Sequence, residues 1–393
     1  MVSSRLRLLC SGIFLPIILV GCGDAPSNIG LGLVDVQAGE PFVVSLEPTS
    51  FETSSEADIT GGFLTITNSI QRAGATRFLV GSTFDPALGT LAAEGRLNFV
   101  TLEAATDAFR NGQVSSAVLT MDLDYAYGDT LTPLTLRLSS ILDDWSAAGV
   151  RSDTVMSIGE PIMEIEVDPT ADLLEIELPG SWVSANNVLL RSESFSSDFR
   201  GFHLSQIDGN VVVGFAAASS FLRIAAAADT LRVDVDKVLT AIKRDASVTP
   251  AEFLLLQDGV DIIDVVHDFD TDEIINSSIH LAIFRLNTTL PSLVTPVGYY
   301  RPLLESVSLV AITGNEESRT VLDERDVDDD GILSFQSTNL NVAMQNTVLG
   351  RGDLVRFELQ APIEDNSLNV LFFERTPEAG GPRLLLTVTE VRQ

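Results

Sequence analysis

Positive charge is scarce in this sequence of 393 residues, which carries 24 Lys and Arg residues against 55 Asp and Glu residues. The formal charge of −31 excludes a nucleic-acid binder that works through a basic surface, because phosphate contacts need clustered Lys and Arg. The 2 cysteines exclude a disulfide scaffold and a Cys-based zinc site. Neither a Gly-rich phosphate loop nor a G-x-S-x-G nucleophile elbow is present.

Apolar residues are plentiful by contrast. They make up 45% of the chain, and the mean hydropathy is +0.25, which excludes an intrinsically disordered protein. The length is typical of two or three domains. Only Lys237 and Lys243 are lysines, so nearly all positive charge is arginine. A GC-rich genome and a high-salt habitat both account for this scarcity, and the sequence alone does not separate them.

The N-terminus has the pattern of a secretory signal. Arg5 and Arg7 precede an apolar run, Leu8–Val20, that is shorter than the ~20 residues of a membrane-spanning helix. The run ends in Leu19-Val-Gly-Cys22, which resembles the bacterial lipobox, where the cysteine is diacylated and becomes the new N-terminus. We therefore expect a lipoprotein signal peptide over residues 1–21 and a lipid on Cys22. The alternative is a plain secretory signal with a chance cysteine.

Small and polar residues follow Cys22, and we interpret residues 22–50 as a flexible tether. No later stretch is long and apolar enough to cross a membrane. Several acyl chains on one terminus give firm anchoring, whereas one chain gives only marginal binding. The expected location is therefore a membrane reached through lipid, with the outer membrane favoured.

Alternating and β-branched segments dominate the rest of the chain. In Leu134–Leu138, leucines alternate with Thr135 and Arg137, as expected for a strand with one buried and one wet face. Many short strands between Gly, Pro, Asp and Asn turns predict an all-β fold of two antiparallel, jelly-roll-like sandwiches. We place them at residues 51–245 and 250–393. A short helix is the expectation for Val235–Arg244.

Several segments together resemble a known group of proteins. Ala117–Leu123, Leu134–Leu138 and Asp144-Trp145 resemble the DNRLRE-type module, although no second Trp follows closely. Cys22 and the stretch Phe78–Gly89, with its Gly-x-x-x-Asp-Pro-x-x-Gly spacing, resemble uncharacterised bacterial surface lipoproteins. The resemblance implies sandwich domains like those of carbohydrate-binding modules. It brings no set of catalytic residues.

Two acidic clusters are candidate metal sites. Asp326, Asp328 and Asp330 before Gly331 have the spacing of a calcium loop, but Ser337 stands where a full loop has an acidic ligand. A partial Ca²⁺ loop and a solvated acidic turn are the two interpretations. The second cluster, His267–Glu273, is open to the same two interpretations. No other cofactor is expected.

Aromatic side chains are the usual platform for sugars, because ring faces stack on pyranose C–H surfaces. The candidate platforms are Trp145, Trp182, Tyr299 and Tyr300. Tyr299-Tyr300 precedes Arg301-Pro302 in an expected loop, which favours exposure of at least one ring. The alternative is packing within hairpins.

These observations predict a membrane-anchored cell-envelope lipoprotein without catalytic activity, whose sandwiches bind extracellular polysaccharide or matrix. The first alternative is a structural subunit of an envelope assembly, with envelope proteins as partners. The second alternative is a polysaccharide-processing enzyme. With 55 acidic residues, a pair of carboxylates is available anywhere, so their abundance carries no information about catalysis.

Overall fold

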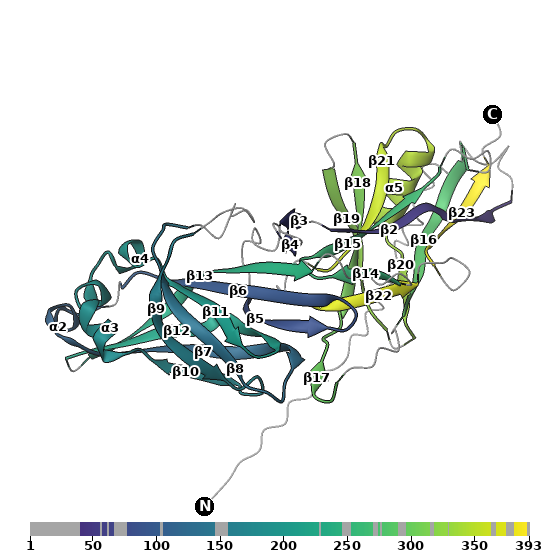
Figure 1. Ribbon diagram of the computed structural model, residues 1–393. Coiled ribbons are helices and arrows are strands. Elements are labelled where there is room, and N and C mark those ends of the chain that lie inside the picture. Colours follow the sequence, from purple (N-terminus) through teal and green to yellow (C-terminus); the bar gives the residue numbers. More distant parts are fainter. Residues whose placement is uncertain are drawn as a thin grey trace, which may run out of the picture.

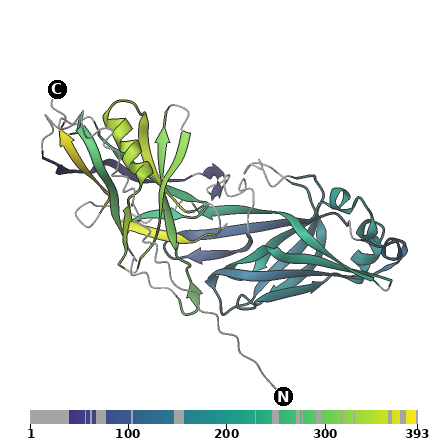
Figure 2. The ribbon, with the colours of Figure 1, turned by 180° about the vertical axis from the view of Figure 1, so that it is seen from behind.

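The computed structural model describes most of the chain from residue 40 onward. The described residues are 40–55, 57–60, 63–66, 77–102, 105–145, 156–227, 229–245, 253–269, 274–275, 277–289, 296–314, 318–328, 330–362, 367–374 and 381–390. Two large antiparallel sheets form two modules that lie side by side in Figure 1 and, from behind, in Figure 2. The expected all-β fold with two antiparallel sandwiches is confirmed.

The N-terminal module is a 12-stranded sheet. Its strands are β3 (Ala57–Thr60), β4 (Phe63–Ile66), β5 (Arg77–Asp85), β6 (Gly89–Phe99), β7 (Val114–Asp129), β8 (Leu134–Ile141), β9 (Ile158–Val167), β10 (Leu173–Glu177), β11 (Phe202–Asp208), β12 (Val211–Ala226), β13 (Asp229–Asp245) and β17 (Tyr299–Tyr300). Four short helices accompany them: α2 (Asp107–Asn111), α3 (Gly180–Ala185), η1 (Leu189–Arg191) and α4 (Phe195–Asp198).

The C-terminal module is an 11-stranded sheet. Its strands are β1 (Phe42–Leu46), β2 (Pro48–Ser55), β14 (Phe253–Gln257), β15 (Asp261–His267), β16 (Ser277–Thr289), β18 (Ser306–Thr313), β19 (Ser318–Asp326), β20 (Ile332–Phe335), β21 (Leu354–Gln360), β22 (Val370–Glu374) and β23 (Arg383–Glu390). One helix, α5 (Thr338–Val348), packs on β16.

Alternation and burial agree along many of these strands. Leu134, Leu136 and Leu138 of β8 are fully buried, as their spacing predicts. The expected helix at Val235–Arg244 is wrong, because these residues pair with β6 as part of strand β13. Val238, Leu239, Thr240 and Ile242 are all buried there. Three of these, Val238–Thr240, are consecutive, so the period-two pattern that would identify a strand is interrupted.

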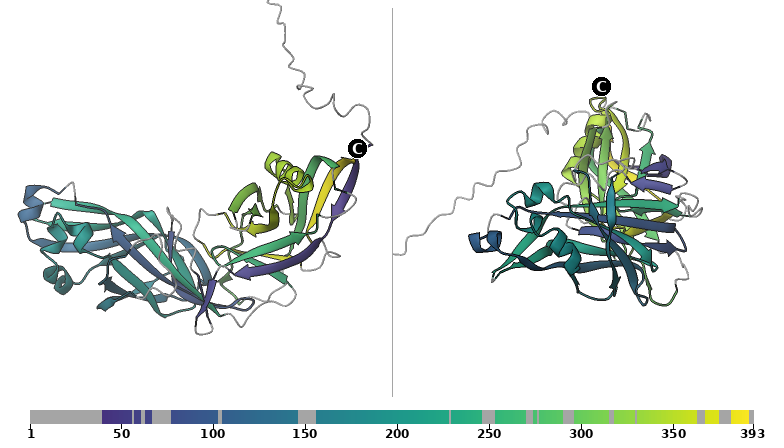
Figure 3. Two further views of the ribbon diagram at one scale, coloured as in Figure 1. Left: turned by 90° about the horizontal axis from the view of Figure 1, so that it is seen from above. Right: turned by 60° about the vertical axis from the view of Figure 1, so that its left-hand side comes forward.

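The two modules exchange strands. β1 pairs with β23 and β2 pairs with β15, so the first strands of the chain complete the C-terminal module. Figure 3 shows β1, in purple, lying along the yellow β23. We expected residues 22–50 to be a flexible tether. In the structure, residues 42–46 form β1 and residues 48–50 begin β2. Conversely, β17 is encoded in the C-terminal half of the chain but pairs with β7 of the N-terminal module.

A shared apolar cluster joins the modules. Leu79, Leu91, Tyr127, Val212 and Ile242 of the N-terminal module pack with a second set from the C-terminal module. That second set is Leu255, Val260, Leu368, Val370 and Phe372. Separating the modules would expose these side chains to water, at roughly 25 cal/mol per Å² of apolar surface. The junction therefore holds the two modules in one arrangement.

Candidate functional site

The strongest polar contacts at the junction converge on Asp85. This residue ends β5 and begins the turn Asp85-Pro-Ala-Leu-Gly89 that leads into β6. Its Oδ1 accepts hydrogen bonds from the backbone N–H of Ala87 at 2.7 Å and of Leu88 at 3.2 Å. Gly89 closes the turn with a φ of 78°, which a glycine adopts without steric cost. The carboxylate is thereby fixed and fully buried.

Arg301 reaches this carboxylate from the segment after β17. Its Nε and Nη2 donate to the two oxygens of Asp85 at 2.7 and 2.8 Å, which is a bidentate ion pair. Tyr127 donates its hydroxyl at 2.6 Å and Tyr299 donates at 3.2 Å. Burial raises the pKa of Asp85, but the hydrogen bonds from Arg301, Tyr127 and Ala87 outweigh it and lower the pKa. The charged pair is therefore the stable form at the junction.

Further polar contacts cross the same junction. Arg244 of β13 forms a bidentate pair with the buried Asp261 of β15. The hydroxyl of Tyr125 accepts a hydrogen bond at 3.1 Å from the backbone N–H of Leu368. These contacts and the apolar cluster together join the two modules.

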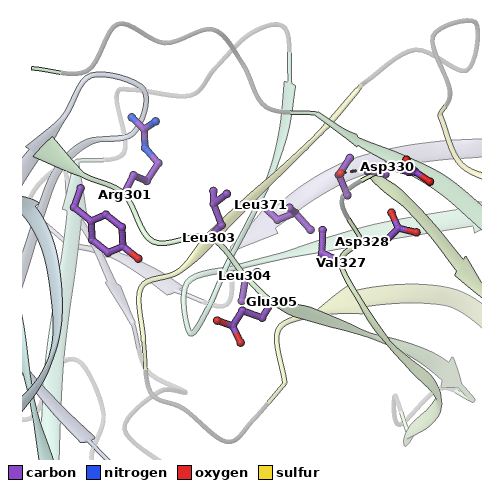
Figure 4. Close-up of a pocket in the computed structure, with 11 residues that line it drawn as sticks. Arg301, Leu303, Leu304, Glu305, Val327, Asp328, Asp330 and Leu371 are labelled. Carbon is purple, nitrogen blue, oxygen red and sulfur yellow. Dashed lines mark hydrogen bonds between the residues drawn. The ribbon is translucent and has the colours of Figure 1, made fainter.

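A pocket of about 610 Å³ opens beside this fixed segment. Its lining residues come from four segments of the chain and are Thr288, Tyr300, Arg301, Leu303, Leu304, Glu305, Val327, Asp328, Asp330, Gly331 and Leu371. Figure 4 shows Arg301 at one end, Asp328 and Asp330 at the other, and leucine side chains between them. The pocket therefore combines apolar surface with carboxylates.

Backbone hydrogen bonds hold the pocket walls. Leu304 donates to the carbonyl of Val370 at 3.0 Å, and Val370 donates to that of Pro302 at 3.2 Å. Val327 donates to the carbonyl of Glu305 at 2.8 Å, which joins the segments that carry the acidic side chains. The turn at Gly331 is tied to β16 by a 2.7 Å bond from the N–H of Thr288. Main-chain hydrogen bonds therefore hold together the segments that line the pocket.

The structure places the four candidate platforms in different surroundings. Tyr300 is 56% exposed and lines the pocket, whereas Tyr299 is partly buried on Asp85. Trp145 is 7% exposed and donates its indole N–H to the carbonyl of Arg200 at 2.6 Å. Trp182 packs against the rings of Phe199 and Phe202. Of the four, only Tyr300 presents an exposed ring to this pocket.

The three predicted calcium ligands are all exposed, and two of them, Asp328 and Asp330, line the pocket. Oδ1 of Asp328 accepts a hydrogen bond at 3.1 Å from the backbone N–H of Ile332, as in a turn. Among the residues that the structure describes, no group of three His, Cys, Asp or Glu side chains is arranged to hold a metal ion. Ser337, at the position of the missing ligand, caps α5 by accepting from the N–H of Leu340 at 3.1 Å. Calcium binding by Asp326, Asp328 and Asp330 stays a prediction.

The second acidic cluster has a different character. Residues 270–273 lie outside the described part of the chain, and His267 is buried among the rings of Phe269, Phe284 and Phe357. Neither ring nitrogen has a hydrogen-bond partner among the described residues. Burial lowers the pKa of His267 from 6.5 to about 4, so the imidazole is neutral at pH 7.

Cys22 and the expected signal peptide also lie outside the described residues. Within the described ranges, none of the helices has the length and apolar character needed to cross a bilayer.

The sequence reasoning did not identify Asp85 or Arg301 as partners. Both stood in segments that were singled out, the Asp-Pro turn within Phe78–Gly89 and the Arg-Pro after Tyr300. Each residue precedes a proline in a turn segment, which is the one local feature that they share. Because 216 positions separate them, the sequence does not indicate that they are in contact.

Comparisons with known proteins add little to this geometry. No family model matches the chain, and no curated protein matches it. A structure of the Macrobrachium rosenbergii nodavirus aligns with 99% of this chain and 96% of that chain, at 9% identity and a TM-score of 0.15. A score at that level carries no argument about fold or function.

Proposed function

We propose that the protein is a lipid-anchored component of the cell envelope, without a catalytic role, that binds polysaccharide in the junction pocket. The lipid would be attached to Cys22, and the outer membrane is the proposed location. The observation that carries the binding proposal is the position of Tyr300, which is exposed beside the carboxylates of Glu305, Asp328 and Asp330 in one hollow. The sequence suggested the ring and two of these carboxylates separately.

The chemistry of this pocket suits a neutral sugar. The exposed face of Tyr300 and the apolar side chains of Leu303 and Leu304 match the C–H face of a pyranose ring. Carboxylate oxygens accept hydrogen bonds and suit the hydroxyl groups around the ring. The guanidinium of Arg301 is held by Asp85, so it supports the wall of the pocket and leaves the carboxylates to set its charge. A polyanion would be repelled here.

A glycan array tests the binding. The full-length protein is applied in detergent beside Tyr300→Ala and a matched control, Phe42→Ala, which removes an exposed ring that does not line the pocket. We expect neutral glycans to bind and Tyr300→Ala to weaken them by about tenfold, or ~1.4 kcal/mol. Unchanged binding by Tyr300→Ala, or an equal loss in Phe42→Ala, would contradict the proposal.

The anchor is tested separately by Cys22→Ser. We expect the wild-type protein to incorporate a labelled fatty acid and to fractionate with membranes, and the variant to do neither. A variant that stays membrane-bound at its full precursor mass would contradict the lipid anchor.

One feature favours the alternative of a structural subunit. β1 is the edge strand of its sheet and exposes Phe42 at 42% and Val43 at 65%. An open edge with apolar side chains is a surface to which another chain can add a strand. Co-purification of a stoichiometric partner that is lost on Val43→Lys would support this function, and recovery of the monomer alone would argue against it.

A further inference from the structure

Several of the few basic residues of the chain, including both lysines, lie on one face of the N-terminal module. Directly opposed residues of antiparallel strands point to the same face, and side chains two apart along a strand share it. Arg96 of β6 is opposite His203 of β11 and Leu239 of β13. Lys237 and Lys243 lie two and four positions from Leu239 along the same register. Both lysines of the protein therefore share a face with Arg96 and His203.

Arg96 is unusual on this face because its side chain is both charged and buried. It is 8% exposed, and its Nε is buried without a hydrogen-bond partner among the described residues. Burial lowers the pKa of Arg96, and the charge of Glu94 offsets only part of this effect. A buried charge without hydrogen bonds is costly, and proteins normally pair such groups. The fold therefore tolerates a guanidinium whose Nε–H has no hydrogen-bond partner among the described residues.

Glu94 is the carboxylate that the neighbouring basic side chains share. His203 Nε2 lies 3.4 Å and Lys243 Nζ 3.9 Å from its two oxygens. The hydrogen bond from His203 and the charges of Lys243 and Arg96 lower the pKa of Glu94, against the effect of burial. One acidic side chain thus balances Arg96 and Lys243, and part of the positive charge of this face is left for another anion.

A polar pocket of about 440 Å³ continues from the same face. Asn98, two residues from Arg96 on β6, lines it together with Lys237, Arg200, Ser196 and Ser197. The remaining lining residues are Asp144, Trp145 and Phe199. Lys237 donates to the carbonyl of Trp145 at 2.6 Å and stands 4.6 Å above its ring. Arg200 pairs with Asp144, whose side chain is 82% exposed. Hydroxyl and amide groups here are the partners that sugar hydroxyls need.

We propose that Arg96, Lys243, Lys237 and Arg200, with His203 beside them, form a binding face for an acidic polysaccharide, whose carboxylates or sulfates pair with the arginine and lysine side chains. The six positions from Lys237 to Lys243 span about 20 Å of strand, which suits a chain with several charges better than a single small anion. The hydroxyl and amide groups of Asn98, Ser196 and Ser197 suit sugar hydroxyls, and this favours a saccharide over duplex DNA. None of these residues lines the junction pocket, so the two proposed sites are separate.

Affinity electrophoresis and calorimetry on the full-length protein test the proposal. The probes are polygalacturonate, which carries carboxylates, heparin, which carries sulfates, and neutral dextran. A duplex DNA is included as a dense polyanion. We expect one or both acidic saccharides to bind and the affinity to fall as salt rises, while dextran and DNA do not bind at this face. The two saccharide arms distinguish carboxylate from sulfate recognition.

Two variants locate the binding, and a third variant is a charge-matched control. Arg96→Gln and Lys243→Gln each remove one positive charge from the face, and we expect each to weaken binding by about tenfold. Arg223→Gln removes one positive charge from an exposed position on β12, where Arg223 pairs with Glu175, and we expect it to leave binding unchanged.

Three results would overturn the proposal. They are an equal loss in Arg223→Gln, unchanged binding in a folded Lys243→Gln protein, and DNA binding that depends on Arg96. Lys243 is half exposed, so its variant should fold even if Arg96→Gln does not. Loss of neutral-glycan binding in Tyr300→Ala with acidic-saccharide binding retained would separate this face from the junction pocket.

Discussion

Arg301 and Arg96 are both largely buried, but their surroundings differ. Arg301 makes two hydrogen bonds to Asp85, which is also held by Tyr127 and the turn of Ala87. Arg96 has a buried Nε without a partner among the described residues and only a share of Glu94. Arg301 stabilises the junction, whereas the unpartnered Nε of Arg96 is expected to lower the free energy of unfolding. Hydrogen bonding, more than burial, distinguishes the junction arginine from the arginine of the proposed binding face.

The largest expected effect comes from breaking the junction pair. Arg301→Ala leaves the carboxylate of Asp85 buried without its main partner, and we expect the free energy of unfolding to fall by roughly 3–5 kcal/mol. Urea unfolding followed by tryptophan fluorescence measures this. The double variant Asp85→Ala with Arg301→Ala is the control, and it should recover part of the loss. A change below about 1 kcal/mol in the single variant would contradict the structural role.

A pH titration tests a third buried polar group, His267, which is unpaired like Arg96 but neutral. Its pKa of about 4 in the fold lies below the 6.5 of the unfolded chain, so the unfolded chain binds the proton first. The stabilisation is complete above pH 6.5 and decreases as the pH falls toward 4, by about 3 kcal/mol in all. Unfolding measured across this range should show the slope in the wild type. His267→Phe should remove most of it, and an unchanged slope would contradict the assignment.

Arg96→Met should act in the opposite direction to Arg301→Ala. Replacing an unsatisfied buried charge by an apolar side chain of similar length is expected to leave stability unchanged or to raise it by about 1 kcal/mol. Thermal unfolding measures the difference, with Arg301→Met as the contrasting variant. A loss of more than about 2 kcal/mol in Arg96→Met would mean that this guanidinium has a structural partner after all.

The smallest effect is expected at Tyr300, because its ring is exposed and its neighbours are held by backbone hydrogen bonds. Tyr300→Ala should change the free energy of unfolding by less than about 0.5 kcal/mol. Tyr299→Ala is the comparison, since it removes a hydrogen bond to Asp85 and should cost more. Equal losses in the two variants would show that Tyr300 is part of the junction and not a free ring.

Much of the fold could be predicted from local patterns. The alternation in Leu134–Leu138 marks a strand because one of its faces is core and the other is not. The same rule fails for Val235–Arg244, where three consecutive residues, Val238–Thr240, are buried. It also fails to place β1 and β2, because a strand pattern does not say which distant strand will pair with it.

The candidate site was predicted only in parts. Exposure of one ring of Tyr299-Tyr300 was expected, and Tyr300 is exposed. The acidic run near Asp328 was a candidate metal site, and two of its residues, Asp328 and Asp330, line the same pocket. The cationic face was missed, because Arg96, His203 and the two lysines are adjacent only after β6, β11 and β13 align. Contacts that depend on register between distant strands leave no local signature.

The docking of β1 on β23 decides which end of the protein would stand nearest the bilayer. With a lipid on Cys22, roughly 20 residues lead from the membrane to Phe42, a reach of at most about 70 Å. The chain would then enter the C-terminal module before it turns to the N-terminal one. The module encoded first would be held farther out and the module encoded last closer in. The cationic face would thus be presented to the surroundings on the outer half of the molecule, away from anionic headgroups that would otherwise compete for it.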